Sequence, residues 1–322
     1  MASRRRVNGH IANGKRLIST IVGALVLIAA IVTYLEQEYL VPDEDIRWQG
    51  STSAVSGNEA EVYFFDVGQG DCTLIRIGEY TMLIDASISS EADSIIDNLD
   101  VLGVQELNAV VATHPHADHV GGMTRVIEEY PIDVFYMPIL PDADTPTTRT
   151  YENMLDALDE NSVTVMAITD ETDISAPNGA RFEVLSPYQG DEWDDLNNYS
   201  AVIRFTYGEV SFMLTGDAEK EVEERILMDN GDISADILKC GHHGSSSSTS
   251  PEFLAAVDPA VAIISCGEDN DYGHPHRETM SSLNEQGCDI YQTWQDGSVL
   301  VLTDGTGYSV NRWNAEDPAS AA

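Results

Sequence analysis

Lysine is scarce in this sequence, with only Lys15, Lys220 and Lys239 among 322 residues. Basic residues number 16 in all against 55 acidic ones, which gives a formal net charge of −39. Such a surface repels polyanions at long range, which argues against tight, sequence-independent nucleic-acid binding by phosphate neutralisation. It does not exclude a nucleic-acid substrate held by metal ions. An Asp-rich, Lys-poor surface suits high salt, where screening removes its self-repulsion.

Paired cysteines are absent as well. The four cysteines, at positions 72, 240, 266 and 288, include no CxxC pair, which argues against a zinc-finger framework. Cys240 and Cys266 lie in or beside apolar runs, where a buried free thiol is the usual explanation. A disulfide is permitted outside the cell, but the spacing indicates no pairing.

One long segment carries no charge: residues 17–35 (LISTIVGALVLIAAIVTYL), 19 residues in all. In helical conformation it matches a hydrocarbon core of ~30 Å, which predicts a single transmembrane anchor in the cell membrane. Because the preceding residues 1–16 are basic, the positive-inside rule places them in the cytoplasm and the remainder outside the cell. A cleaved signal peptide is the alternative, but the run exceeds a typical signal core and no small-residue cleavage site follows it.

The remaining chain divides into a linker, a folded domain and a tail. Residues 36–60 mix acids with Ser and Gly and predict a linker, and residues 313–322 predict a flexible tail. Residues 61–312 alternate short apolar runs with amphipathic stretches, which predicts mixed sheets covered by helices, an α/β (α+β) fold. Helices are expected at residues 91–102, 219–228, 251–257 and 278–285, and closing strands at 290–294 and 298–304.

Seven of the eight histidines fall in three clusters, each after an apolar run. The densest is THPHADHVGG (residues 113–122), which contains His114, His116, Asp118 and His119. Imidazoles and carboxylates are ligands for zinc and manganese, and catalytic sites leave one coordination position open for water. The alternation lets His114 and His116 point one way and Asp118 and His119 another, so one loop can serve one or two divalent ions, Zn or Mn.

Several blocks of this sequence resemble the metallo-β-lactamase superfamily, and within it the hydrolase-like domain of ComEC-type competence proteins. They are FDVGQGDCTLIRI (65–77), LIDAS (83–87), THPHADHVGG, NNYSAVIRFTYGEVSFMLTGDAE (197–219), ILKCGHHGSSSS (237–248) and YGHPH (272–276). The resemblance implies a four-layer αββα sandwich with a one- or two-metal hydrolytic centre.

The resemblance also implies metal ligands. His114 and His116 would bind a first ion, Asp118 and His119 a second, and Asp217 would bridge the two. An N-cap of the following helix is the alternative role for Asp217.

The pair His242 and His243 is expected to supply the last ligand. We assign His243 as the ligand and His242 as a group facing the substrate, although the reverse assignment is also open. Asp85 matches a family residue that orients the ligands by hydrogen bonding. His274 would act as a general acid or substrate contact, with a capped loop before a helix as the alternative.

The expected substrate contacts are Lys239, Ser245 and Asn198. Asp66 and Asp71 flank the turn VGQG, which a tight glycine turn explains as well as a functional role does.

The sequence departs from the family pattern at two points. It has no histidine between positions 120 and 238, where the superfamily has a third ligand, and Asn197, Asn198 and Ser200 occupy the equivalent stretch. The metal position on the Asp118 and His119 side should therefore have the more complete set of ligands. In addition, one membrane span cannot form a DNA-conducting pore.

The expected activity is hydrolysis of a phosphodiester by metal-activated hydroxide, since metal binding lowers the pKa of water from ~15.7 toward ~7. Asp118 or Asp217 would orient the nucleophile, and His242 or His274 would protonate the leaving oxygen.

DNA is the first choice of substrate. A small phosphodiester, a cell-envelope ester such as a phosphorylcholine ester, or a lactone is the enzymatic alternative. A non-catalytic accessory that works with separate DNA-uptake channel proteins is the third hypothesis. The sequence indicates no oligomeric state.

Overall fold

The computed structural model describes residues 59–177 and 179–315. The segments expected at 1–16 and 17–35, and nearly all of the expected linker, lie outside these residues. Within the described part of the chain, no helix is both long and apolar enough to span a bilayer.

The first of two sheets has eight strands in the order β14-β13-β1-β2-β3-β4-β5-β6. Strands from β14 to β3 pair antiparallel, and strands from β3 to β6 pair parallel. Their bounds are β1 (Ala60–Phe64), β2 (Thr73–Ile77), β3 (Tyr80–Ile84), β4 (Ala109–Val111), β5 (Phe135–Met137), β6 (Val165–Ala167), β13 (Ser298–Thr303) and β14 (Tyr308–Trp313).

The second sheet has six strands in the order β12-β11-β10-β9-β8-β7. It is antiparallel from β7 to β9 and parallel from β9 to β12. Its strands are β7 (Ala180–Ser186), β8 (Val202–Tyr207), β9 (Val210–Leu214), β10 (Ile237–Lys239), β11 (Val261–Ile264) and β12 (Asp289–Gln292).

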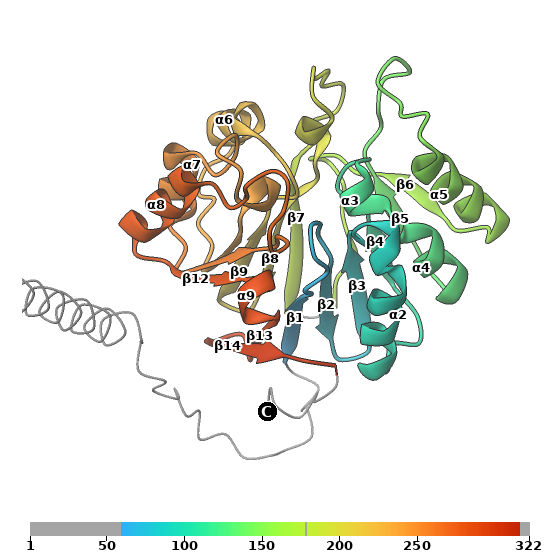
Figure 1. Cartoon of the computed structure of the whole chain (residues 1–322), viewed down its shortest axis with the longest axis horizontal. Coiled ribbons are helices and arrows are strands. Elements are labelled where there is room, and N and C mark those ends of the chain that lie inside the picture. The colour runs from blue at the N-terminus through green and yellow to red at the C-terminus, as the bar shows by residue number, and fades with distance from the viewer. Residues whose placement is uncertain (1–58, 178, 316–322) are drawn as a thin grey trace, which may run out of the picture. The chain divides into compact units, whose positions relative to one another are not determined.

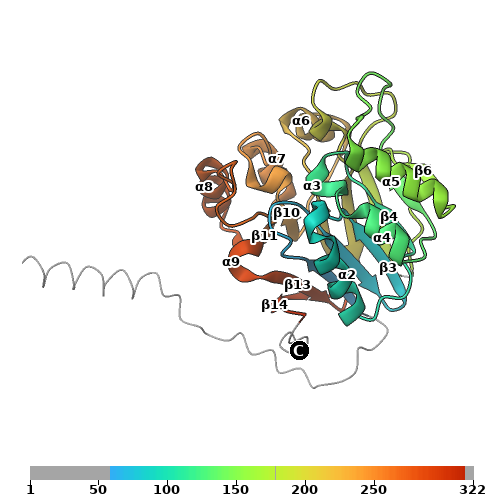
Figure 2. The same ribbon diagram turned by 45° about the vertical axis from the view of Figure 1, so that its right-hand side comes forward.

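Helices cover the outer face of each sheet, as Figures 1 and 2 show. On the first sheet lie α2 (Ala92–Val101), α3 (Ala117–Val120), α4 (Met123–Glu129) and α5 (Arg149–Glu160); on the second lie α6 (Lys220–Asp229), α7 (Pro251–Val257) and α8 (Arg277–Gln286). Short elements are α9 (Thr293–Asp296), η1 (Ser89–Glu91), η2 (Leu196–Tyr199) and η3 (Gly241–Gly244).

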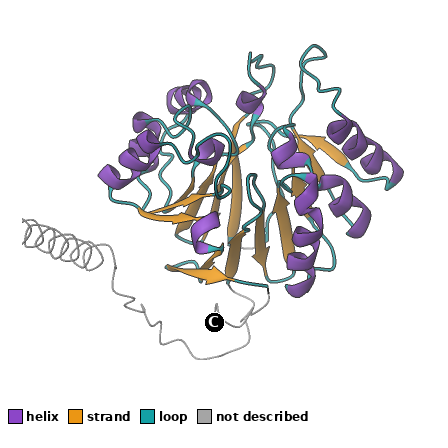
Figure 3. Ribbon diagram, viewed as in Figure 1, coloured by secondary structure: helices purple, strands orange, loops and turns teal. Residues whose placement is uncertain are grey.

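Three apolar clusters hold the layers together. One fills the space between the sheets, where the rings of Phe182, Phe205 and Phe212 stack with centroids 5.0 and 5.4 Å apart. The other two lie under the helices on either side. Helix, sheet, sheet and helix thus form four layers (Figure 3), which confirms the two-sheet α/β architecture expected from the sequence. All four cysteines are buried free thiols.

One closing strand differs from the expectation. Residues 293 and 294, expected at the end of a strand, begin α9 instead. The carboxylate of Asp296 accepts the amide of Gln292 at 2.9 Å, and this local hydrogen bond turns the chain out of the sheet.

The parallel strands determine where the polar motifs meet. Asp85 follows β3, His114 follows β4, Asp217 follows β9 and the His242–His243 pair follows β10, each within a few residues of the strand end. Because parallel neighbours end at the same sheet edge, these loops gather at one rim of the sandwich.

A close contact between two turns makes the fold sensitive to an added side chain at Gly208. This residue joins β8 to β9 with φ +63°, and an added Cβ would lie 2.3 Å from the carbonyl oxygen of Gly305. Gly78 joins β2 to β3 with φ +60° and has nothing within 4 Å of its Cβ position.

We predict that Gly78→Ala lowers the free energy of unfolding by ~1–2 kcal/mol through backbone strain. Gly208→Ala should cost a further ~1–3 kcal/mol through overpacking. Urea unfolding measures both, and equal losses would contradict the role given to the Gly208–Gly305 contact.

Candidate metal centre

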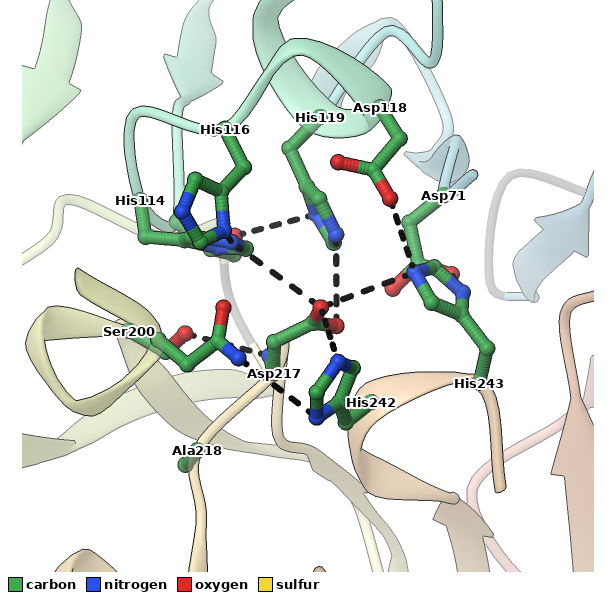
Figure 4. A network of polar contacts seen from close by, with 12 residues as sticks. Asp71, His114, His116, Asp118, His119, Ser200, Asp217, Ala218, His242 and His243 are labelled. Atoms are coloured by element: carbon green, nitrogen blue, oxygen red, sulfur yellow. Dashed lines mark hydrogen bonds and ion pairs between the residues drawn. The ribbon is translucent and has the colours of Figure 1, made fainter. Parts of the chain in front are cut away.

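Asp217 lies at the middle of the polar cluster in Figure 4, 1% exposed. Its Oδ1 is 3.2 Å from His119 Nε2, and its Oδ2 is 3.5 Å from His243 Nε2. The Nε2 atoms of His242 and His114 lie 3.8 and 3.9 Å from Oδ2. The helix N-cap that follows is Glu219, so Asp217 does not have the capping role that was its alternative explanation.

Four side chains form a group that fits a cation. Donor atoms of Asp118, His119, Asp217 and His243 all lie within 4.8 Å of one another. Among the described residues, the buried atoms His119 Nε2, His243 Nε2 and Asp217 Oδ1 form no hydrogen bond of normal geometry. Nitrogen and oxygen atoms that converge in this way can hold a divalent metal ion.

Hydrogen bonds on the far side of each imidazole aim these donors. His119 Nδ1 lies 2.7 Å from Asp85 Oδ2, and Asp85 also accepts the amide and hydroxyl of Thr113 at 2.8 and 2.7 Å. His243 Nδ1 lies 2.9 Å from the carbonyl oxygen of Ser265. Bonds of this kind set the tautomer and ring orientation of metal-binding histidines. Asp85 thus lies where it can orient the ring of His119.

The other metal position is less complete. His114 Nε2 lies 3.0 Å from His116 Nδ1, and Asp217 Oδ2 is the carboxylate oxygen near His114. In the stretch that replaces the third histidine, Ser200 Oγ accepts the amide of Asp217 and Asn198 Oδ1 accepts the amide of Glu219, both at 3.1 Å. These side chains support the Asp217 loop, and Asn198, only 4% exposed, is not positioned as the expected substrate contact. His114 and His116 thus have fewer donor atoms around them than the group of Asp118, His119, Asp217 and His243.

The adjacent histidines take different places. Both have left-handed backbone, with φ of 50° at His242 and 54° at His243, and this unusual turn points both rings toward Asp217. His243 is 1% exposed and also lies 3.4 Å from Asp118. The His242 side chain is 24% exposed, with Nδ1 3.2 Å from both Glu219 Oε1 and Ser247 Oγ. The geometry favours His243 as the ligand and His242 as the substrate-facing group.

Lys239 is not placed as expected. It is 2% exposed, and its Nζ lies 2.6 Å from Asp71 Oδ2, so the ammonium is paired inside the protein and does not reach the mouth of the site. Ser245 is also buried, with its hydroxyl 3.0 Å from Ser247 Oγ.

Asp71, for which the sequence left a simple turn as an equal explanation, is part of the support of the centre. Its amide donates to the carbonyl oxygen of Asp118 at 3.1 Å, and its Oδ1 lies 3.5 Å from His243 Nδ1. A buried acid needs a counter-charge, and Lys239 supplies it from a position far away in the sequence, so no local signal in the sequence indicated this role. Asp66, on the other side of the turn, is exposed and accepts the amide of Gly68.

His274 lies against the histidine pair, with ring centroids 5.4 Å from His242 and 6.2 Å from His243. The N-cap of α8 is His276, so capping does not explain His274. Burial, together with the neighbouring imidazoles of His242, His243 and His276, lowers its pKa to about 4.

The centre is electrostatically prepared for positive charge. Burial alone would lower the pKa of His243, but Asp217, Asp118 and Asp71 raise it to about 10. Burial is likewise outweighed at His119, where Asp217 and Asp85 hold the pKa well above its usual value. Burial would raise the pKa of Asp217, yet His119 and His243 hold it well below the usual range. Without a cation, protonated imidazoles balance the buried carboxylate.

These shifts predict that metal affinity rises with pH. A divalent cation must displace the protons of His119 and His243, whose pKa values are raised, so protons compete with the cation at His243 below about pH 10 and at His119 well above its usual pKa. We expect the apparent affinity for Zn²⁺ to increase about tenfold per pH unit for each displaced proton between about pH 6 and 8. Competition with a chromogenic chelator measures this. Affinity independent of pH would contradict the proton count.

The buried ion pair yields a stability prediction. Lys239→Met removes the closest counter-charge of the buried Asp71 and should lower the free energy of unfolding by ~3–5 kcal/mol, whereas Lys239→Met combined with Asp71→Asn should recover most of the loss. Urea unfolding in chelator compares the two variants with the parent. A double variant less stable than Lys239→Met would contradict the pairing.

The chain is similar in sequence to known proteins and in fold to solved structures. The chain is 31% identical over 260 residues to ComE operon protein 3 of Bacillus subtilis, covering 75% of this chain and 33% of that protein. It is 29% identical over 248 residues to competence protein ComA of Neisseria gonorrhoeae, covering 76% and 33%. The chain thus spans about a third of the length of these relatives. The crystal structure of the metallo-beta-lactamase fold protein YhfI from Bacillus subtilis aligns with a TM-score of 0.49 at 12% identity, covering 78% of this chain and 100% of that one.

A family model described as the metallo-beta-lactamase superfamily matches residues 65–268. This span runs from the end of β1 to the loop after β11. It includes Asp85, the HxHxDH loop, Asp217 and the His242–His243 pair. Because the match covers more than half of the sequence and the donor set fits a cation, this chain belongs to the metallo-beta-lactamase superfamily of metallo-hydrolases.

Proposed function

We propose that this protein hydrolyses phosphodiester bonds, with DNA as the first-choice substrate, using one or two divalent ions of the Zn²⁺ or Mn²⁺ type. The observation that carries the proposal is the four-donor group of Asp118, His119, Asp217 and His243 next to the partly exposed imidazole of His242. The similarity to competence proteins supports DNA as the substrate.

The residues divide the chemistry between them. A cation held by the four-donor group would supply Lewis-acid chemistry, by lowering the pKa of water and polarising the phosphoryl oxygens. Asp118, less buried than the other three donors, can orient the attacking water. Burial would raise its pKa, but the close approach of His243 and the charge of His119 lower it to about 2, so it accepts hydrogen bonds as a carboxylate near neutral pH.

His242 is the best-placed group to protonate the leaving oxygen. Its Nε2 faces the centre, while Glu219 and Ser247 hold Nδ1. The hydrogen bond with His242 is the largest cause of the lowered pKa of Glu219. This carboxylate holds the orientation of the ring, as the acid partner of a catalytic histidine does.

Membrane anchoring through residues 17–35, with the hydrolase domain outside the cell, is part of the proposal. The uncharged run and the basic residues before it support this arrangement. Separate DNA-uptake channel proteins are the proposed partners, supported by the competence relatives.

A small phosphodiester, a cell-envelope ester or a lactone is the second candidate substrate. The net charge of −39 favours it, since a long polyanion is repelled more strongly than a small substrate.

A substrate panel tests these alternatives. The full-length chain, supplied with Zn²⁺ or Mn²⁺, is incubated with DNA, RNA and small phosphodiesters, and acid-soluble products are counted. Release of nucleotides that stops in chelator supports the nuclease. Turnover of small phosphodiesters alone would contradict DNA as the substrate. No hydrolysis of any of them would leave the metal-binding accessory role.

The roles proposed for His242 as general acid and for Asp217 as metal ligand predict different losses of function in matched variants. His242→Gln should lower kcat about 10²–10⁴-fold with metal content unchanged, because it removes only the general acid. Asp217→Asn should remove bound metal as well as activity. Metal analysis beside steady-state kinetics separates these outcomes. Loss of metal in His242→Gln would instead make His242 a ligand.

A further inference from the structure

Three aromatic rings form a row that leads from the surface to the metal centre. Tyr272 stacks on His274 with centroids 5.6 Å apart and planes at 21°. His274 stacks in turn on His243 at 6.2 Å and 27°. The exposed fraction falls from 65% at Tyr272 to 9% at His274 and 1% at His243. The outermost face of this row is therefore an open aromatic surface beside the predicted active site.

The loop that carries Tyr272 and His274 is braced from within. Asn270 accepts the amide of His274 at 3.0 Å and donates to the carbonyl oxygens of His274 and Gly267 at 2.7 and 2.9 Å. His276 Nε2 lies 3.3 Å from the carbonyl oxygen of Tyr272. The tyrosine ring is thus presented by an ordered turn, which reduces the entropy cost of using it as a binding surface.

The interior ring of the row has unused hydrogen-bonding capacity. His274 is buried, and its Nδ1 has no hydrogen-bond partner among the described residues. A flat ring with an unpaired nitrogen suits a planar aromatic ligand that can form hydrogen bonds.

The charges around the row also favour an uncharged ligand over a phosphate. Glu268, Asp269 and Asp271, next to Tyr272 in sequence, are all exposed. They repel a sugar-phosphate backbone, so affinity here cannot come from phosphate neutralisation. A nucleobase carries no charge, and stacking on an aromatic side chain tolerates any base.

We propose that Tyr272, backed by His274, is the stacking platform for a nucleobase that flanks the scissile phosphodiester of a single-stranded nucleic acid. This inference rests on the proposed phosphodiesterase function and specifies its substrate class. A strand whose bases are free can place one base on Tyr272 while a neighbouring phosphate lies at the metal centre; paired bases in a duplex cannot do so without unstacking.

Steady-state kinetics with matched substrates tests the platform. Full-length protein is assayed on a short single strand of thymidines and on the same strand with abasic residues around the cleaved bond. Tyr272→Ala should raise KM on the base-bearing strand about 5- to 150-fold, leave kcat nearly unchanged and leave the abasic strand unaffected. Tyr272→Phe should behave like the parent. Trp294→Ala, which removes an exposed aromatic ring from α9, is the matched control. An unchanged KM in Tyr272→Ala, or equal losses on both strands, would overturn the inference.

Photocrosslinking gives a readout that needs no turnover. A strand carrying 5-iodouracil is irradiated with the full-length protein and the adduct is mapped by mass spectrometry. We expect crosslinking at Tyr272, with a higher yield in about 2 M than in about 0.1 M KCl, because salt screens the repulsion between the acidic surface and the strand. An adduct elsewhere, or a yield that falls with salt as in phosphate-dominated binding, overturns the platform. An adduct at Tyr272 without cleavage of any strand would keep the base site and reject the proposed hydrolysis.

Discussion

The buried carboxylate of Asp217 is the group around which the rest of the site is organised. It is almost inaccessible to solvent, and imidazoles of four histidines from two loops lie within 3.9 Å of its oxygens. A buried negative charge is costly unless it is paired, and here protonated His119 and His243 supply the pairing when no cation does. The same charge makes the site favourable for a divalent cation. Protonation and metal binding are therefore alternative ways of balancing one carboxylate.

The fold supports this arrangement by using strand ends from both sheets. Asp85 orients His119 from the first sheet, and the carbonyl of Ser265 orients His243 from the second. The ion pair between Asp71 and Lys239 crosses between the sheets, and the backbone of Asp71 is bonded to Asp118. Gly70 permits this approach, because a Cβ there would lie 2.6 Å from the carbonyl oxygen of Asp118. The metal donors are thus held by groups that do not themselves face the substrate.

The acidity of the chain bears on how such a site can recognise its substrate. Lys239, the lysine closest in sequence to the metal-binding histidines, is used inside the protein, and the loop around Tyr272 is acidic. Phosphate neutralisation by surface cations is therefore a poor source of affinity. Metal ions at the centre and stacking at its edge can replace it, and neither depends on a basic surface. A hydrolase of this kind would tolerate, and even benefit from, high salt.

The sequence by itself determined the fold class, the HxHxDH loop and the chain positions of Asp217 and the histidine pair, because strand-end motifs and hydrophobic periodicity are local properties. It left both a ligand role and a helix-cap role open for Asp217, and it predicted that Lys239 contacts the substrate. Only the tertiary structure decided that Asp217 lies among four imidazoles, that His243 lies inside and His242 outside, and that Lys239 pairs with Asp71. These outcomes depend on contacts between residues far apart in the chain, where the packing of one sheet on the other determines which groups are buried.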